Sequence, residues 1–494
     1  MKHFFYFLLS LFIVASCNNG AYLSGTSDSS VDVDSSDGKE ERGNDDETTF
    51  FNLKVEQNEK NVLSCRLTFN TKEKKKMSVK YFSKDHKGYE ITEENKTTDH
   101  YFFLWGMRAE EEYEIEIYEE DISSPVATAD YTSGALPLKT PGTFLATNEK
   151  EKVADGFVLF KSAPATIDEP LLLATMVDTD GKVVWYFEYD MAGSNHLGDL
   201  QYIEKTETIL ISLSKGLNMA DIPAEEAIEI DLEGNIIWKS KETLFVKGEA
   251  GSWHHIYNLL PDDTIVYLTL EFSNALISDT IVNIDRDYNE LWKWRYLDHL
   301  EPPFCSGSEW CDWTHSNFVT MLKDEGVVYL NSRNLSSFFK IDMESGNILW
   351  TFGKDGDFAL SSDVEHPWFE YAHAPKITGD RVLFYDNGSF ERGYSRVIEY
   401  KLDFEEKRAE ISFTYDGSND GNKWFTEFWG DADNLPNGNI FVTAGTHDLS
   451  EDSRLFEITR EGEKVWELLM AKEETWMYIL YNSQKFTPPL KKIE

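Results

Sequence analysis

The stretch "VDTDGKVVW", Val177–Trp185, is the first of six similar segments in the chain. Each segment has an apolar strand end, a turn built around Asp, Gly or Asn, and a second strand that closes on an aromatic residue, which is typical of a β-hairpin. The other copies are "IDLEGNIIW" (Ile230–Trp238), "IDRDYNELW" (Ile284–Trp292), "IDMESGNILW" (Ile341–Trp350), a weaker "LDFEEKRAEISF" (Leu402–Phe413) and "ITREGEKVW" (Ile458–Trp466). Their closing aromatic residues are 53, 54, 58, 63 and 53 residues apart.

This period decides the fold that we expect. Six copies of a hairpin unit about fifty residues long are typical of a β-propeller, in which each blade buries a face that its neighbours cover. A solenoid is the alternative arrangement of such repeats. A helical period is visible only near the C-terminus, around Glu473–Tyr481. The sequence therefore predicts an all-β chain with a six-bladed β-propeller over residues 141–494.

Residues 50–140 predict a second, smaller domain. Short segments there alternate apolar and polar residues at a spacing of about ten, as in an antiparallel β-sandwich. They are "NVLSCRLTF", "KMSVKYF", "EEYEIEIYE" and "VATADYT". The stretch "LWGMRAEEEYEIEI", Leu104–Ile117, resembles the Leu-to-Tyr corner of fibronectin type III modules. We therefore expect a small fibronectin type III or Ig-like sandwich before the propeller, joined to it through "LPLKTPGTF".

The N-terminus predicts export. Residues 1–16 form a signal peptide with a charged start, the apolar run "FFYFLLSLFIVA", which is too short to span a membrane, and small residues before Cys17. Val14-Ala15-Ser16-Cys17 resembles a bacterial lipobox, so Cys17 is expected to be the lipidated first mature residue; ordinary cleavage with an incidental cysteine is the alternative. Residues 17–49 are rich in Ser and Asp and predict a solvated acidic tether. The chain is thus expected to be anchored by lipid to the bacterial membrane, at the periplasmic face or the cell surface.

Charge and cysteine usage narrow the partners and the compartment. The formal net charge of −42 argues against nucleic acid, whose phosphates need Lys and Arg contacts, and against a polybasic grip on anionic lipid. Cys305 and Cys311 frame "CSGSEWC", a spacing that suits a small-loop disulfide in an oxidising compartment, with two free thiols as the alternative. Cys65 is expected to be a small core residue.

Histidines recur at one phase of the repeat. Each copy has a leading apolar strand, which we expect to be the innermost strand of its blade. Polar residues stand at the entry to five of these strands: His196, His254 with His255, His315, His373, and finally Asp431 with Asp433. Equivalent positions in a propeller are related by rotation about its axis. These side chains should therefore converge on one mouth of the central channel, which is a preferred place for a ligand.

A second set of polar residues follows the same strands. It comprises Arg333 of "NSRN", Asn387 and Arg392 of "YDNGSFERG", and His447 of "AGTHD". Single residues have ordinary structural alternatives: hydrogen-bonded histidines for His196, His254, His299 and His366, and carboxylate pairing for Arg333 and Arg396. The joint pattern of His315, His373, Arg392 and His447 favours a functional site.

These motifs together resemble a known family. The stretches that carry the similarity, over roughly residues 140–470, are "DWTHSNFV", "VVYLNSRNLSSFFKIDMESGNILWTFG", "YAHAPKI", "VLFYDNGSFERGYSRVIEY" and "AGTHDLSEDSRLFEI". They resemble the bacterial aryl-sulfate sulfotransferases, six-bladed propellers with an N-terminal sandwich domain. The resemblance implies transfer of a sulfuryl group from a phenolic sulfate ester to an acceptor phenol by ping-pong through a sulfohistidine, without a nucleotide sulfate donor, a metal or another cofactor. It leaves the oligomeric state open.

The resemblance also implies roles for particular residues. The nucleophile falls on His447, the arginine on Arg392, and the supporting histidines on His373 and His315. His255 of "SWHHIY" is an alternative for the role of His315, and with Arg333 and Asn387 it makes up the expected substrate-binding set. Two departures from the family pattern, Asn334 in place of a histidine and Ala372 in place of a glutamine, concern substrate contacts rather than the reaction type.

The chemistry requires such a set. A sulfuryl group in transfer spreads negative charge over its oxygens, so catalysis needs positioning and fixed positive charge. A neutral imidazole is a competent nucleophile, and a further histidine can move the phenolic proton. A zinc hydrolase is less favoured, because no close-spaced His-Glu-x-x-His signature is present. A non-catalytic tethered propeller that binds glycan or protein is the stronger alternative, because a fold alone does not determine function.

Overall fold

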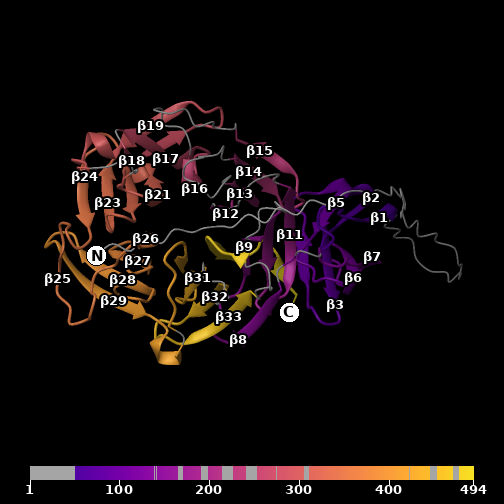
Figure 1. Ribbon diagram of the computed structural model, residues 1–494. Coiled ribbons are helices and arrows are strands. Elements are labelled where there is room, and N and C mark those ends of the chain that lie inside the picture. The colour runs from indigo at the N-terminus through magenta and orange to yellow at the C-terminus, as the bar shows by residue number, and fades with distance from the viewer. Residues whose placement is uncertain are drawn as a thin grey trace, which may run out of the picture. The chain divides into compact units, whose positions relative to one another are not determined.

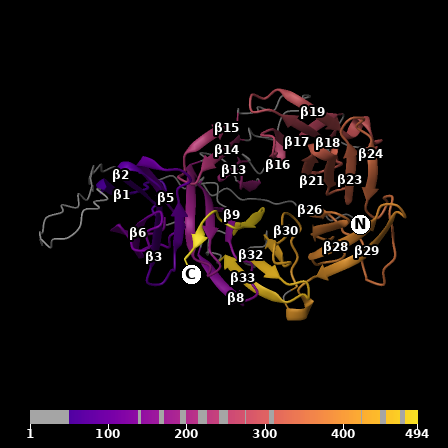
Figure 2. The ribbon, with the colours of Figure 1, turned by 180° about the vertical axis from the view of Figure 1, so that it is seen from behind.

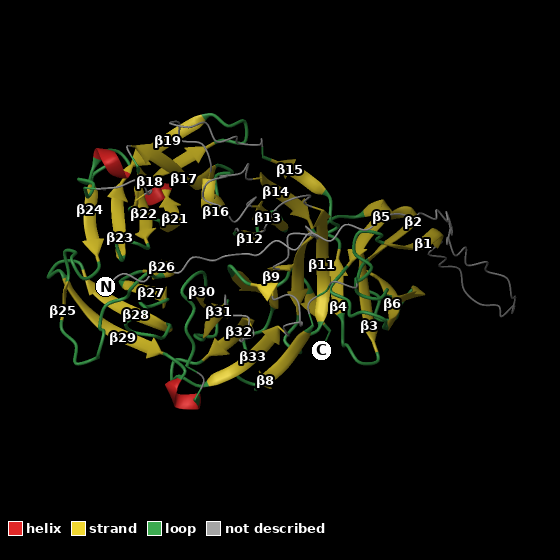
Figure 3. Cartoon of the chain, viewed as in Figure 1, coloured by secondary structure: helices red, strands yellow, loops and turns green. Residues whose placement is uncertain are grey.

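The computed structural model describes residues 50–493, except 138, 139, 141, 165–170, 191–198, 214–225, 241–252, 274, 305–310, 422, 446–452 and 471–477. The described residues are built from β-strands and three short 3₁₀ turns, η1 (Tyr296–Asp298), η2 (Lys323–Glu325) and η3 (Ser418–Asp420), as Figure 3 shows. The all-β prediction is confirmed. The helical period around Glu473–Tyr481 predicts a helix there, and this prediction is wrong for the described residues of that range, because Tyr478–Ile479 form strand β34. In these described parts, no helix is long and apolar enough to cross a membrane.

The N-terminal part is a pair of sheets with the orders β1-β2-β5 and β36-β4-β3-β6-β7. The strands are β1 (Phe50–Gln57), β2 (Cys65–Lys75), β3 (Met77–Ser83), β4 (Tyr89–Thr92), β5 (Thr97–Leu104), β6 (Glu112–Glu119), β7 (Ala127–Thr132) and β36 (Lys491–Lys492). Strand β36 comes from the other end of the chain and pairs with β4. This pairing cannot be predicted from the sequence, because a strand of two lysines has no apolar pattern.

Alternation along the strands builds the core of this part. Cys65, Leu67 and Phe69 on β2 are buried, and the residues between them are partly exposed. Cys65 is a free and buried thiol, as expected. The hydroxyl of Tyr113 accepts a hydrogen bond of 2.8 Å from the backbone N–H of Arg108, which is the contact of a tyrosine corner. The corner predicted from Leu104–Ile117 is therefore present.

Six further sheets occupy the chain between Thr143 and Phe486. Each is built around an antiparallel meander of consecutive strands, to which β8, β34 and β35 add from the other end of the repeat region and β20 and β25 add in parallel. The first sheet contains β9 (Phe157–Pro164), β10 (Leu171–Val177), β11 (Val183–Asp190), β34 and β35 (Ser483–Phe486). The second contains β12 (Leu200–Ile203), β13 (Thr208–Leu213), β14 (Glu226–Asp231) and β15 (Ile236–Lys239). The third contains β16 (Trp253–Leu259), β17 (Ile265–Ser273), β18 (Leu276–Ile284), β19 (Glu290–Arg295) and β20 (Cys311–Asp312). The last three contain β21 (Ser316–Leu322), β22 (Val327–Ser332), β23 (Ser337–Asp342) and β24 (Ile348–Phe352); β25 (Ala359–Leu360), β26 (His373–Thr378), β27 (Arg381–Asp386), β28 (Arg396–Asp403) and β29 (Arg408–Tyr415); and β30 (Asp431–Asn434), β31 (Ile440–Ala444), β32 (Ser453–Ile458), β33 (Lys464–Met470) and β8 (Thr143–Asn148).

The repeated tryptophans explain why the sequence keeps its period. The indole N–H of a closing tryptophan donates to a backbone carbonyl in the hairpin turn of the next sheet: Trp185 to Leu232 at 2.8 Å, Trp292 to Met343 at 2.9 Å, and Trp466 to Thr179 at 2.9 Å. The last of these bonds joins the sixth copy to the first. Two other copies make a ring contact instead, since Trp238 stacks on Tyr288 and Trp350 on Phe404.

Both ends of the repeat region complete sheets at the opposite end of the sequence. Strand β8 pairs with β33, and β35 pairs with β9, as the views in Figures 1 and 2 show. The first strands of successive sheets also touch in chain order, β35 with β12, β16 with β21, β21 with β26, and β26 with β30. The hydroxyl of Ser483 on β35 bonds that of Thr443 on β31, so the sixth sheet also meets the first.

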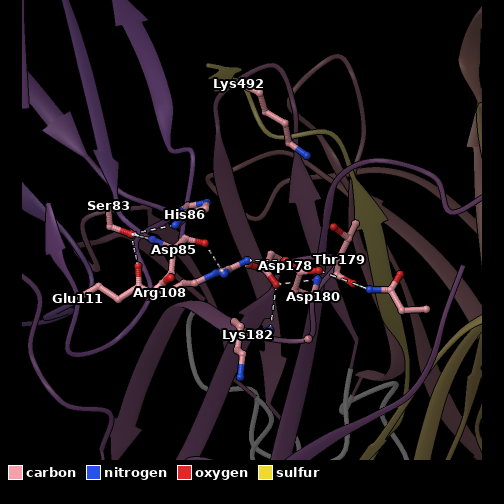
Figure 4. Close-up of polar contacts among 12 residues, drawn as sticks. Ser83, Asp85, His86, Arg108, Glu111, Asp178, Thr179, Asp180, Lys182 and Lys492 are labelled. Carbon is pink, nitrogen blue, oxygen red and sulfur yellow. Dashed lines mark hydrogen bonds and ion pairs between the residues drawn. The ribbon is translucent and has the colours of Figure 1, made fainter. Parts of the chain in front are cut away.

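The N-terminal sheets share a core and ion pairs with the first repeats. Arg108 Nε donates to Asp178 Oδ2 at 2.8 Å, and Arg108 Nη2 to Asp180 Oδ2 at 2.9 Å, both in the first hairpin turn (Figure 4). In addition, Phe157 of β9 packs edge-on against Tyr89 and Trp105. The N-terminal sheets therefore contact the first sheet of the repeat region through both ion pairs and apolar packing.

Candidate active site

A cavity of about 430 Å³ runs between the first strands of the six sheets. Its walls come from β35, β12, β16, β21, β26 and β30, one strand from each sheet. His373 lies in its wall together with Tyr481, whose ring centroid is 6.0 Å from that of His255. Except for β35, the strands that line the cavity thus begin close to the predicted polar positions. The apolar strands expected to be innermost, β13, β17, β22, β27 and β31, are instead the second strands of their sheets.

The same irregularity recurs where three of these strands begin. The pairing register shifts at the start of β16, β21 and β26, directly after or beside the predicted histidines. Left-handed φ angles occur there at non-glycine residues, 60° at His255, 41° at His315 and 44° at Ala374. Such angles are costly for residues with a Cβ and cluster at functional sites. A bulge re-aims the side chain at a strand end, which explains how one sequence phase presents several imidazoles.

His255 and His315 lie together. Their ring centroids are 5.0 Å apart, with an angle of 74° between the planes. His315 Nδ1 is 2.5 Å from Asp312 Oδ2, so a carboxylate orients this imidazole. The sequence left open which of the two histidines belongs to the site, and the structure brings both to it.

His254 connects His255 to a buried carboxylate, that of Asp279. Its Nδ1 is 2.6 Å from His255 Nδ1, and its Nε2 is 3.0 Å from Asp279 Oδ1. Burial opposes the charge of Asp279, but His254, the Thr314 hydroxyl and the Ser316 amide outweigh it and lower the pKa of this carboxyl. Sequence reasoning treated His254 as structural. The only signal in the sequence was the tandem pair in "SWHHIY", which does not reveal a carboxylate 25 residues away.

His373 has a different partner. Its Nδ1 is 2.7 Å from Asn387 Oδ1, and the Asn387 amide donates to the carbonyls of Thr426 and Trp429, each at 2.8 Å. These donations fix the amide orientation, so Asn387 Oδ1 accepts and His373 Nδ1 carries the hydrogen. Burial, with the nearby Arg333 charge, lowers the pKa of His373 to about 3, although the hydrogen bond that His373 donates to Asn387 acts in the opposite direction. His373 is thus a neutral imidazole whose Nε2 holds a lone pair.

Arg333 supplies positive charge near His255 and His373. Its guanidinium carbon is 4.9 Å from the ring centroid of Tyr371 and 5.2 Å from that of Phe428. Its terminal nitrogens donate to Asn334 Oδ1 at 3.0 Å and to the Glu427 carbonyl at 3.2 Å, while its buried Nε has no hydrogen-bond partner. Among the residues that the structure describes, it has no ion pair, and burial lowers its pKa although the charges of Glu427 and Asp312 act in the opposite direction. A guanidinium that is held in place without an ion pair suits an incoming anion.

Arg392 is placed differently. Its side chain is fully buried, with Nη1 2.5 Å from Asp386 Oδ2, Nη2 donating to the Asp386 carbonyl at 2.9 Å and Nε to the Tyr394 carbonyl at 3.0 Å. Arg396 shares the same carboxylate at 2.8 Å. Gly388, at φ 82°, is required here, because a Cβ would lie 2.4 Å from Arg392 Nη2. The described contacts of Arg392 thus lead to the backbone beside Asn387 and not directly to the imidazoles.

The remaining predicted residues fall into two groups. His299 stacks on Trp294, and the His366 carbonyl accepts a hydrogen bond from Arg396, in line with structural roles. Four residues lie outside the described parts of the chain: Cys17, His196, Cys305 and His447. The sulfated histidine and the Cys305–Cys311 disulfide therefore stay predictions.

Comparison with known proteins bears on this site. The arylsulfotransferase (ASST) family model matches residues 145–479, more than half of the chain. A comparison with curated proteins gave no match. Among solved structures, a protein of unknown function from Bacteroides caccae is 17% identical, with a TM-score of 0.43 over 68% of this chain and 100% of that one. A protein from Lactobacillus plantarum is 12% identical, with a TM-score of 0.37 over 84% of this chain and 99% of that one. From the match across its six sheets, the chain belongs to the arylsulfotransferase family.

Proposed function

We propose that the chain is a nucleotide-independent aryl-sulfate sulfotransferase that moves a sulfuryl group from a phenolic sulfate ester to an acceptor phenol by ping-pong through a sulfohistidine. Membership of the family supports aryl sulfotransfer in general. The observation that carries the proposal is the convergence of His255, His315 and His373 near Arg333, a guanidinium without an ion pair among the described residues. Imidazoles with a fixed cation are what a sulfuryl transfer needs.

The two arginines have separate parts in this proposal. Arg333 binds the sulfuryl oxygens, because it has no ion pair and its Nε has no hydrogen bond among the described residues. Arg392, to which the resemblance gives a catalytic role, acts through Asp386 and the adjoining Asn387, which orients His373. Charge that is fixed before the reaction stabilises the transition state without reorganisation.

His447 is the proposed nucleophile. It follows Ala444, the last residue of β31, by three positions in the sequence. Attack of its imidazole on sulfur would split the transfer into two easier displacements, with the phenol product leaving before the acceptor arrives. His373, as a neutral imidazole, and His315, backed by Asp312, are the proposed supporting groups.

We also propose the finer features of the architecture and location. Six sheets whose inner strands and tryptophans link them in chain order support a six-bladed β-propeller after a fibronectin type III-like sandwich. The signal peptide and lipobox support export and a lipid anchor at Cys17, and the "CSGSEWC" spacing supports the Cys305–Cys311 disulfide.

The direct test of the activity uses 4-nitrophenyl sulfate with and without phenol. Release of 4-nitrophenol that depends on phenol, with phenyl sulfate as the second product, supports transfer. Release without an acceptor indicates a sulfatase. No release with either mixture contradicts the proposed enzyme and favours a tethered binding module.

A further inference from the structure

We propose that Asp279, His254 and His255 form a proton relay that gives the departing phenolate its proton and takes one from the acceptor phenol. The inference rests on the proposed sulfotransferase function. Its basis is a continuous line of three side chains: Asp279 Oδ1 to His254 Nε2 at 3.0 Å, and His254 Nδ1 to His255 Nδ1 at 2.6 Å. The line starts inside the third sheet and ends at the ring that faces His315.

The hydrogen positions follow from the partners of Asp279. Its Oδ2 accepts from the Thr314 hydroxyl at 2.6 Å and from the Ser316 amide at 2.5 Å, so Oδ1 is left for His254. His254 Nε2 and Asp279 Oδ1 lie at ion-pair distance but outside hydrogen-bond alignment, and neither atom has another hydrogen-bond partner in the described structure. The hydrogen of His254 therefore belongs on Nε2, facing the carboxylate.

The tautomer of His254 determines the hydrogen position on His255. With its hydrogen on Nε2, His254 offers a lone pair at Nδ1, and His255 must donate from its own Nδ1 across the 2.6 Å contact. The lone pair of neutral His255 is then on Nε2. When that atom takes a proton, the buried Asp279 carboxylate stabilises the positive charge through His254. The aspartate of a catalytic triad orients and stabilises its histidine in the same way.

The three imidazoles at the site are backed by different groups. His373 is held by an amide, His315 directly by Asp312, and His255 by a second imidazole and then a carboxylate. Burial, with His254, His315 and Arg333 nearby, lowers the pKa of His255 well below its ordinary value, so it is neutral before an anion binds. Its left-handed φ of 60° is a costly conformation of the kind that clusters at functional sites.

Each half-reaction balances with this relay. Because His255 is neutral in the free enzyme, its Nε2 takes a proton from solvent when the anionic donor binds. In the first half-reaction, an imidazole lone pair forms the N–S bond, the S–O bond to the aryl group breaks with its electron pair going to oxygen, and His255 Nε2 gives that oxygen its proton. In the second, the acceptor oxygen attacks sulfur, the N–S bond breaks with its pair returning to the imidazole, and His255 Nε2 takes the phenolic proton. The relay is thus reset after one turnover.

The test compares two donors that differ in their need for a proton. Phenyl sulfate has a poor leaving group, whereas 4-nitrophenolate leaves without help. We expect His255→Asn to lower kcat/KM for phenyl sulfate by about 10²–10³-fold and for 4-nitrophenyl sulfate by less than about tenfold. His254→Asn should show the same selectivity, with a loss of about tenfold for phenyl sulfate. Asn tolerates left-handed φ, so the fold at His255 should be kept.

His366→Asn is the matched control. His366 also has a left-handed φ, 54°, and only its carbonyl is used in the described contacts. It should leave the ratio between the two donors unchanged. An equal loss with both donors in His254→Asn and His255→Asn would overturn the relay and leave these residues a structural role.

A second readout does not depend on activity. In histidine-labelled protein, the hydrogen between the two Nδ1 atoms should give a far-downfield imidazole N–H resonance that is absent in His254→Asn and in His255→Asn but present in His366→Asn. If the protein turns over neither donor, the proposed function fails while this resonance still decides the relay. Absence of the resonance from the unsubstituted protein, in its folded state, contradicts the relay.

Discussion

His373 Nδ1 lies 2.7 Å from Asn387 Oδ1, inside a protein wall that leaves His373 almost no exposure. Because the Asn387 amide gives both its hydrogens to backbone carbonyls, the imidazole is held as one tautomer. An amide partner, unlike a carboxylate, gives no charge that would favour the imidazolium form. The site thus holds one imidazole through an amide and two through carboxylates, His315 directly and His255 by way of His254.

Replacing this amide by a carboxylate should move the pH profile. Burial holds the pKa of His373 at about 3, so the ring stays neutral through the ordinary assay range. In Asn387→Asp the added negative charge raises that pKa, and activity should be lost as pH falls toward about 5. The measurement is kcat/KM for 4-nitrophenyl sulfate against pH, with Asn387→Ser as the uncharged control. Superimposable acid limbs for Asn387→Asp and the control would contradict a neutral role for His373.

The two arginines should separate binding from stability. Arg392→Gln removes one of two cations from buried Asp386 and should lower the free energy of unfolding by about 2–3 kcal/mol. Arg333→Gln removes a guanidinium that has no ion pair in the described structure, so it should change stability little but lower kcat/KM about 10²-fold. Denaturant unfolding and initial rates of both variants measure this. The reverse pattern would return the anion-binding role to Arg392.

The repeat made much of the fold predictable. Six turns with closing aromatic residues predict the sheets, and the structure shows why, since Trp185, Trp292 and Trp466 each tie one turn to another. The recurrence of histidines at one position of the repeat likewise predicts that His255, His315 and His373 lie near one another, and the structure places His373 in the cavity wall and His255 beside His315. These features follow from local patterns that recur.

Other features could not be predicted because they depend on which side chains meet in the folded chain. Asp386 stands only six residues before Arg392, but the sequence does not show that this carboxylate, rather than a ligand, receives the guanidinium. The role of His254 depends on Asp279, which comes from another strand of the sheet. The register shift at the strand entries is also invisible in the sequence, because the apolar pattern resumes unchanged after it.

The bond that joins the sixth repeat to the first should be measurable. Trp466→Phe loses the hydrogen bond to the Thr179 carbonyl, which should lower the free energy of unfolding by about 1 kcal/mol beyond the loss of volume. Trp350→Phe is the control, because its ring stacks on Phe404 and its indole makes no hydrogen bond within the described structure. Urea unfolding of both variants gives the difference. Equal destabilisation would mean that the bond to Thr179 contributes nothing.

The cavity contains a carboxyl that should make stability depend on pH. Burial raises the pKa of Asp199 to about 6, against the nearby Lys376 and Lys161 charges. A folded pKa above the unfolded value means that folding takes up a proton, so stability is lost as pH rises through about 6. Asp199→Asn should therefore raise Tm above pH 6 and have little effect near pH 4. A Tm difference that shrinks with rising pH would contradict this burial cost.

The most direct test of the account is the mass of the enzyme after exposure to donor alone. Incubation with 4-nitrophenyl sulfate and no acceptor should add about 80 Da, one sulfuryl group, and phenol should then remove it. The adduct should map to His447, be absent in His447→Asn, and remain in His366→Asn. Unmodified enzyme that turns over only when donor and acceptor are both present, together with a fully active His447→Asn variant, would contradict the covalent mechanism.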